Sequence, residues 1–451
     1  MGDVLPPSAA TPATARLQRF FGKLISADRL GYAALQSILL QAAGVLVNFV
    51  TGVITARALG AEGRGVYAAA TAWATLLSSA AVVGLSDAVL IHVRKTPEHA
   101  RALFLCGVLA ALLLATLMCG AAFVFMPLLL GSHGAAALDL ARATLILAHF
   151  TAVGMIMRQV FAGQGRYLAA NLAAFLPFAL HAVLLISCLL LGRLDVTAAI
   201  VCVVGGTVLA LLALLPALLK ELKGPLTGMR QAWRSLVAFA RRAAPADLFA
   251  LGTSWADKLI LIPLLPAAQL GIYVVAANLS RILIIFTPAT GILLSAMSGQ
   301  NRERSAHLHH LALRLTIASY IPLVALTFLL DRLVMTVFYG AEFLAAVAVF
   351  RVLVVEAVLN RVATVTSQLY LSVGRPTLNS VIRGVELALV LVLMVVLAPR
   401  YGPMGAALGL LAGTIVRLVL LWAGLITHLS IPFPRLWLAR SDLAGMRAAF
   451  K

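Results

Sequence analysis

Charged side chains are scarce in this sequence: Asp, Glu, Lys and Arg make up 11% of its 451 residues, against roughly 25% in soluble domains. Hydrophobic residues make up 62% of the chain, and the mean hydropathy is +1.02. A composition so poor in charge excludes a soluble globular protein. It indicates a polytopic membrane protein instead.

Cysteine is also scarce, and the four cysteines form no CxxC pair and show no metal-ligand spacing. We expect them to be small buried apolar residues, and we expect no metal site and no cofactor. The N-terminal stretch "MGDVLPPSAATPATARLQRFFGK" lacks an apolar core leading to a cleavage site, so it is not a secretory signal. We interpret residues 1–30 as a cytosolic leader.

Apolar runs of about 20 residues, the length that crosses a bilayer as a helix, occur about a dozen times along the chain. The sequence therefore predicts an all-α protein with about 12 transmembrane helices. The predicted spans are 32–56, 66–92, 102–128, 138–160, 168–191, 196–219, 244–265, 271–297, 311–330, 343–371, 378–398 and 402–428.

The basic residues between these spans alternate strongly from side to side. One side collects 24 Lys and Arg, whereas the other has only six, namely Arg57, Arg64, Arg142, Arg193, Arg332 and Arg400. By the positive-inside rule, the basic side and both termini of this multi-pass protein face the cytosol. Because the net charge of +19 follows this alternation, we expect the membrane surface, and no nucleic acid, to contact the basic loops.

The chain divides into two halves at its longest polar interval, residues 220–243, a basic linker. The expected domains are bundles of six helices at 31–219 and 244–430, followed by a basic cytosolic tail at 431–451. Three short matches at nearly one offset support a repeat: "GVYA" at 65–68 returns as "GIYV" at 271–274, Gly165-Arg166 as Gly374-Arg375, and Gly206-Thr207 as Gly413-Thr414. Six spans per half make the repeat parallel, with substrate expected between the bundles near mid-membrane.

Three stretches resemble a known family. They are "ARALGAEGRGVY" followed by "GLSDAVLIHVRK" in 56–95, "WADKLILIPLLPAAQLGIYVVAANL" in 255–279, and "SQLYLSVGRPTLNS" in 367–380. They are similar to the polysaccharide (O-antigen, Wzx-type) flippase branch of the multidrug/oligosaccharidyl-lipid/polysaccharide (MOP) exporter superfamily. This resemblance implies a V-shaped transporter of two bundles that flips an undecaprenyl-pyrophosphate-linked oligosaccharide from the cytoplasmic to the periplasmic leaflet by alternating access.

One departure bears on the cargo. The lipid II flippase of that superfamily carries an Arg-Asp pair inside its first span, whereas Gln41 and Asn48 are the internal polar residues of the first span here. The departure lowers the weight of a peptidoglycan precursor as the cargo. The expected partners are a lipid-linked oligosaccharide, membrane lipids and polysaccharide polymerase or export machinery, with the protein itself a monomer.

Ionisable residues inside the predicted spans indicate a hydrated cavity, because each costs about 2.5–3.5 kcal/mol at a helix centre. An anionic headgroup favours bases, and deep bases outnumber deep acids here. The candidates for a cationic substrate cavity are Lys258, Arg281, Arg361, Arg351 and Arg417. The candidates for polar, structural or coupling roles are Asp257, Glu356, Asn48, Asn278, Asn360, His149 and His181.

Several alternatives remain open at this point. Asp257 pairs either with Lys258 or with an arginine of the tenth span, Arg351 either faces the cavity or reaches the headgroups, and Glu356 either neutralises an arginine or carries a proton. "GAEGRG" at 60–65 is interpreted as a turn. The competing functions are a multidrug or cation antiporter of the same superfamily and, from another class, a membrane glycosyltransferase or polysaccharide polymerase. Coupling to H+ or Na+ is not determined.

Overall fold

The computed structural model describes residues 28–130, 134–222, 226, 228–281, 302–429 and 431–432. These residues are helical almost throughout and include no strand. Seven of the described helices are long and apolar enough to cross a membrane. Helices α9, α10 and α13, which carry most of the predicted deep charges, are not among the seven.

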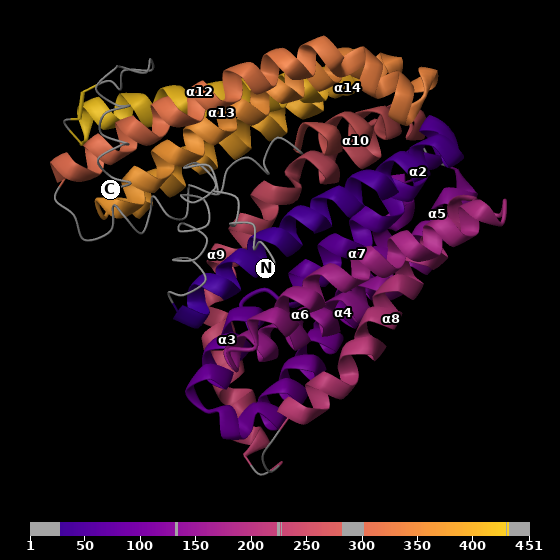
Figure 1. Ribbon diagram of the computed structural model, residues 1–451, viewed down its shortest axis with the longest axis vertical. Coiled ribbons are helices and arrows are strands. Elements are labelled where there is room, and N and C mark those ends of the chain that lie inside the picture. The colour runs from indigo at the N-terminus through magenta and orange to yellow at the C-terminus, as the bar shows by residue number, and fades with distance from the viewer. Residues whose placement is uncertain are drawn as a thin grey trace, which may run out of the picture.

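The first half of the chain forms one bundle (Figure 1). Its helices are α2 (Asp28–Ala81), α3 (Leu85–Lys95), α4 (Ala100–Leu130), α5 (Ala135–Thr144), α6 (Ile146–Gly163), α7 (Tyr167–Leu190) and α8 (Val196–Glu221), with a short 3-10 turn at Pro97–His99 before α4. Helix α2 contains two passes, because Gly60 has φ 68° and ψ −177° and bends the chain back there.

The second half supplies α9 (Met229–Leu264), α10 (Ala267–Arg281), α12 (Arg302–Val334), α13 (Ala346–Ser372) and α14 (Pro376–Thr427). A π-helical turn at Met335–Tyr339 and a 3-10 turn at Ala341–Ala345 join α12 to α13. Helix α14 also contains two passes, separated at Gly402 with φ 59°. With the two passes of α2 and of α14, the course of the chain is that of the predicted 12-helix fold.

Two predicted spans are broken in the structure. The span predicted at 66–92 ends at Ala81, because Gly84 adopts φ 67° and α3 starts afresh at Leu85. The span predicted at 138–160 is interrupted at Leu145, between α5 and α6. Polar residues lie close to both breaks, Ser86 and Asp87 after Gly84 and Arg142 before Leu145, but the predicted spans continue through them.

The predicted linker is largely helical. From Met229 the chain runs without a break through 243–244, the predicted domain boundary, into the seventh span as part of α9. The division into domains remains a prediction. The predicted leader up to residue 27, the end of the eighth span after Arg281 and the tail from residue 433 lie outside the described residues.

The two bundles form a V (Figure 1). They meet where α2 and α10 pack together, and they diverge toward the ends of α3 and α12. We call the first the joined end, defined by residues 57–65, 265–271 and 335–343, and the other the open end. The cavity described below lies between the arms of this V.

At the joined end, α2 and α10 touch through their backbones, with a glycine of each helix against an alanine carbonyl of the other. A Cβ on Gly65 would overlap the carbonyl oxygen of Ala267, and a Cβ on Gly271 would overlap that of Ala61. Each glycine lies 206 residues from its counterpart, as does each alanine, so the contact is pseudo-symmetric. Only glycine allows the helices to approach so closely.

A polar clasp also crosses the joined end. The Arg57 guanidinium donates from Nε to the Phe338 carbonyl at 2.8 Å and from its terminal nitrogen to that of Val337 at 2.5 Å. In return, the Glu342 carboxylate accepts from the Ala61 backbone N–H at 2.9 Å. The ring of Phe49 packs edge-on against that of Phe338, with centroids 5.4 Å apart. The clasp therefore ties the bend of α2 to the α12–α13 connection.

We expect Arg57→Ala to loosen this clasp. The exposed arginine donates charge-assisted hydrogen bonds to carbonyls of a helix terminus, and their loss would cost about 1 kcal/mol, or about fivefold in the opening equilibrium. Hydrogen–deuterium exchange of 335–343 should therefore become several-fold faster. Unchanged exchange there, with Arg193→Ala as control, would contradict the clasp.

Candidate functional site

A cavity of about 520 Å³ lies between the two halves of the chain. Helices α2, α6, α7 and α8 line it from the first half, and α9 and α10 line it from the second. Because the two halves both contribute walls, any relative movement of the bundles changes the shape of this cavity.

Threonines form much of the polar surface that α2 contributes. Thr51 and Thr55 lie one turn apart on its first pass, and Thr71 and Thr75 one turn apart on its second; all four line the cavity. Each hydroxyl donates to a carbonyl three or four residues earlier in the helix, for example Thr71 to Tyr67 at 2.7 Å. These donors are satisfied internally, so the oxygens offer acceptors to a polar ligand.

The charged pair at the middle of "GTSWADKLILIPLLP" divides into two roles. Buried Asp257 lies 3.6 Å from the terminal guanidinium nitrogen of Arg281 and accepts from the Tyr273 hydroxyl at 3.4 Å. Lys258 does not pair with it; its Nζ lies over the Trp255 ring, 4.2 Å from the centroid. Of the two partners considered for Asp257, neither is correct, because Arg281 of the eighth span lies nearer.

Two cavity bases were missed from the sequence. Arg64, counted there among the loop residues, lies in α2 beyond the bend, is 6% exposed and lines the cavity. The interpretation of "GAEGRG" as a turn is therefore wrong for Arg64, since the helix resumes directly after Gly60. Arg158, counted with the basic loops, lines the cavity from α6, five residues before that helix ends.

The structure brings half of the predicted site residues to the cavity. Asn48, His181, Asp257, Lys258, Asn278 and Arg281 line it. In the part of the chain that the structure describes, the lining does not include Arg351, Glu356, Asn360, Arg361, Arg417 or His149. Within the second half, α9 and α10 contribute charged residues to the described lining, whereas α13 and α14 do not.

Arg417 and its neighbours form a network inside the second bundle instead. Arg417 is 3% exposed and lies 3.4 Å from Glu386, with further hydrogen bonds to Asn360 at 3.1 Å and Ser367 at 3.2 Å. Glu356 accepts from the Thr414 hydroxyl at 2.9 Å. These contacts join α13 to both passes of α14, so Arg417 and Asn360 are placed to hold the bundle together rather than to meet a ligand in the cavity.

Outside this network, two further candidates lie away from the cavity lining. His149 is within hydrogen-bond distance of the Thr116 hydroxyl, 3.1 Å away, inside the first bundle. Arg361 lies half-buried on α13.

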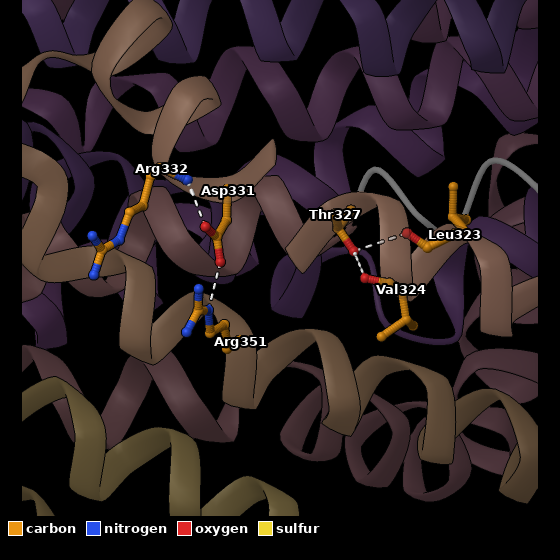
Figure 2. Close-up of polar contacts among 6 residues, drawn as sticks. All are labelled: Leu323, Val324, Thr327, Asp331, Arg332 and Arg351. Atoms are coloured by element: carbon orange, nitrogen blue, oxygen red, sulfur yellow. Dashed lines mark hydrogen bonds and ion pairs between the residues drawn. The ribbon is translucent and has the colours of Figure 1, made fainter. Parts of the chain in front are cut away.

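Arg351 is held by an acid that the sequence analysis did not single out (Figure 2). Its Nε donates to Oδ2 of Asp331 at 2.5 Å, and Asp331, 2% exposed, also accepts from the Arg332 backbone N–H at 2.6 Å. Arg351 does not line the cavity, and its guanidinium pairs with a buried carboxylate between α12 and α13; its contact with headgroups stays a prediction.

We expect Arg351→Met to destabilise the protein, because it leaves Asp331 buried without its cation. A loss of about 1–3 kcal/mol in the free energy of unfolding is the usual cost of an unpaired buried group. The double variant Asp331→Asn, Arg351→Met should recover part of it. Thermal unfolding of detergent-purified protein tests this, with Arg193→Met as control; equal stability of Arg351→Met and wild type would contradict the assignment.

The fold and the cavity define a class of protein. The structure is similar to that of the lipid II flippase MurJ in an inward closed conformation, with a TM-score of 0.69 over 88% of this chain and 87% of that one, at 14% identity. It is also similar to an inward-facing multidrug resistance MATE family transporter of the MOP superfamily, with a TM-score of 0.68 over 86% of this chain and 94% of that one, at 16% identity. The chain therefore has the multi-helix membrane fold of MOP superfamily transporters.

Another MOP superfamily transporter, from Pyrococcus furiosus and described as having a binding pocket of reverse polarity, matches with a TM-score of 0.55 over 90% of this chain and 97% of that one, at 16% identity. No curated protein matches the sequence. The model of the polysaccharide biosynthesis protein family matches residues 33–288, more than half of the chain. The chain belongs to this family, as the resemblance in its sequence predicted.

Proposed function

We propose that the protein flips an undecaprenyl-pyrophosphate-linked oligosaccharide from the cytoplasmic to the periplasmic leaflet of the bacterial inner membrane, by alternating access and as a monomer. The observation that supports this proposal is the charge of the cavity. Its lining holds the bases Arg64, Arg158, Lys258 and Arg281 and one acid, Asp257, which is already paired with Arg281. Three bases are thus left to neutralise an anionic headgroup.

The remaining lining fits the other parts of such a cargo. The threonine oxygens of α2 and the amides of Asn48 and Asn278 suit sugar hydroxyls. A volume of about 520 Å³ lies in the range that buries a drug-sized ligand, so it holds a diphosphate with its first sugars. A longer glycan would extend through the open end.

The exposed bases orient the transporter. Arg94, Lys95 and Arg101 lie exposed at the open end of the first bundle, and Arg230 and Arg234 are exposed on the first turns of α9. By the positive-inside rule, these bases support a cytosolic open end, and the proposal includes cytosolic termini. In this orientation the described state is inward-facing, ready to receive cargo made on the cytoplasmic leaflet.

Antiport of cationic drugs finds less support, because a cationic substrate favours unpaired acids in the cavity and Asp257 is paired. A membrane glycosyltransferase or polymerase also finds less support, because the fold is that of transporters.

The test is a flipping assay in vesicles that contain the purified protein and a fluorescent lipid-linked oligosaccharide. We expect the outer-leaflet signal, read with a membrane-impermeant quencher, to change at least tenfold faster than in protein-free vesicles. Imposed H+ or Na+ gradients then test the coupling. Failure to move this lipid, together with proton-driven export of a cationic dye, would replace the proposal with antiport.

A further inference from the structure

Arg64 is a buried arginine without an acid. It is 6% exposed, and its Nε has no hydrogen-bond partner among the described residues. Its guanidinium carbon lies 5.3 Å from the centroid of the Tyr67 ring. A buried charge normally persists only when something satisfies it.

Two acids lie close to Arg64 in sequence or at the joined end, and neither forms an ion pair with it. Glu342 accepts from the Ala61 backbone N–H, and Glu62 is exposed on the outside of the bend. The buried base Arg417 pairs with the Glu386 carboxylate, so this fold supplies a structural buried base with an acid. Arg64 differs from such a base because its side chain lines the cavity.

Two polar side chains complete the neighbourhood. The Tyr67 oxygen lies 3.5 Å from Nε2 of His181, and both residues line the cavity with Arg64. When Nε2–H of His181 donates to the Tyr67 oxygen, the phenol proton is free to donate to a ligand. In this arrangement the planar guanidinium and the phenol O–H both donate hydrogen bonds to the ligand and accept none from it. Such a set of donors suits the acceptor oxygens of a phosphate.

This group lies deeper than the Lys258 level. Arg64 adjoins Gly65, which contacts the start of α10 at Ala267. Lys258 lies seven residues before Leu265, where α9 ends at the joined end, and seven helical residues span about 10 Å along the helix axis. The two cationic levels are therefore successive along the cavity.

We propose that Arg64, with Tyr67 and His181, forms a second anion site at the closed end of the cavity, which takes a phosphate or diphosphate. Resting on the proposed function, the inference is that the cargo's diphosphate binds first at Lys258 and then at Arg64, next to the contact that must part for release. Binding of the diphosphate at Arg64 would thus be coupled to the contact between α2 and α10 at the joined end.

The test uses inorganic pyrophosphate and the purified full chain. Calorimetric titration of the wild type should show two binding events, of which Arg64→Met removes one and Lys258→Gln the other. Arg64→Lys, which keeps the charge but not the planar fork, should bind about tenfold more weakly at the deep site. Arg193→Met, an exposed arginine of the α7–α8 connection, is the matched control and should bind as wild type does.

Stability without ligand separates this role from a structural one. An uncompensated buried charge predicts that Arg64→Met unfolds at the same or a higher temperature than wild type, while the stabilisation by pyrophosphate decreases. A variant that is less stable without ligand and binds pyrophosphate with unchanged stoichiometry would overturn the site. If the Arg64-dependent binding is found but no lipid-linked oligosaccharide is flipped, the anion site stands and the proposed cargo fails.

Discussion

Valine in place of Gly271 should prevent the two bundles from meeting at the joined end. A Cβ at this position would overlap the carbonyl oxygen of Ala61, and that atom belongs to the backbone of α2, which cannot turn aside as a flexible side chain can. Overpacking costs about 1–3 kcal/mol in ordinary cores, and a backbone contact lies at the upper end of this range. We therefore expect the inward-facing state to become the minor one and transport to fall at least about tenfold.

Spin labels at positions 193 and 401 measure this effect, since Arg193 and Tyr401 are both exposed near the joined end, one on each half. The four native cysteines, which are all free, are first replaced. The distance distribution should shift to longer values in Gly271→Val. Gly120→Val is the control, because a Cβ there meets nothing within 4 Å. An unchanged distribution in Gly271→Val would show that the contact does not govern closure.

Loss of the Lys258 ammonium should slow flipping by about 10- to 100-fold. Hydrogen bonds to charged groups contribute about 1.5–3 kcal/mol, and each 1.4 kcal/mol corresponds to a tenfold change in rate or binding. Lys258 lines the cavity with no carboxylate partner within hydrogen-bond distance in the described chain, so its positive charge is available to a diphosphate. Lys258→Gln removes this charge but keeps a side chain of similar length.

The flipping assay described above tests this expectation, with initial rates compared at equal amounts of reconstituted protein. Lys220→Gln is the matched control, because Lys220 is exposed at the end of α8 and does not line the cavity. Lys258→Arg should keep most of the rate, since it keeps the charge. Equal rates for Lys258→Gln and wild type would assign Lys258 to packing on Trp255 alone.

The number and order of the spans follow from composition, because lipid imposes about 20 apolar residues on every crossing. The positions at which the helices are interrupted do not follow from composition. The helices are interrupted at Gly84 and Leu145, and the cause at Gly84 is partly tertiary: its N–H donates to the Asp247 carboxylate of α9 at 2.9 Å. A contact across 163 residues leaves no local pattern.

The sequence indicates which charged residues lie far from the ends of the predicted spans. It does not indicate whether their side chains face the cavity or another helix of the same bundle. Arg417 and Arg351 lie as deep as Lys258 by residue count, yet Glu386 and Asp331 neutralise them within the second bundle. Their partners are on other passes, so spacing along one helix does not reveal them. Arg64 was missed because glycines on both sides suggest a turn; the threonines at four-residue spacing in α2 were the available sign that this helix faces a polar space.

The close contact between α2 and α10 also determines how far the open end moves for a given rotation of the two bundles. The backbones of α2 and α10 touch at Gly65 and Gly271, so this contact, the pivot of the arms, has no side chains of its own to re-pack as the angle between the arms changes, and the clasp of Arg57 and Glu342 lies beside it. An arm of 20 helical residues is about 30 Å long, so a rotation of about 10° at the pivot moves its far end by about 5 Å. Closing the open end therefore requires little rearrangement where the arms touch, and the amplitude of the movement is determined by helix length rather than by the flexibility of the pivot.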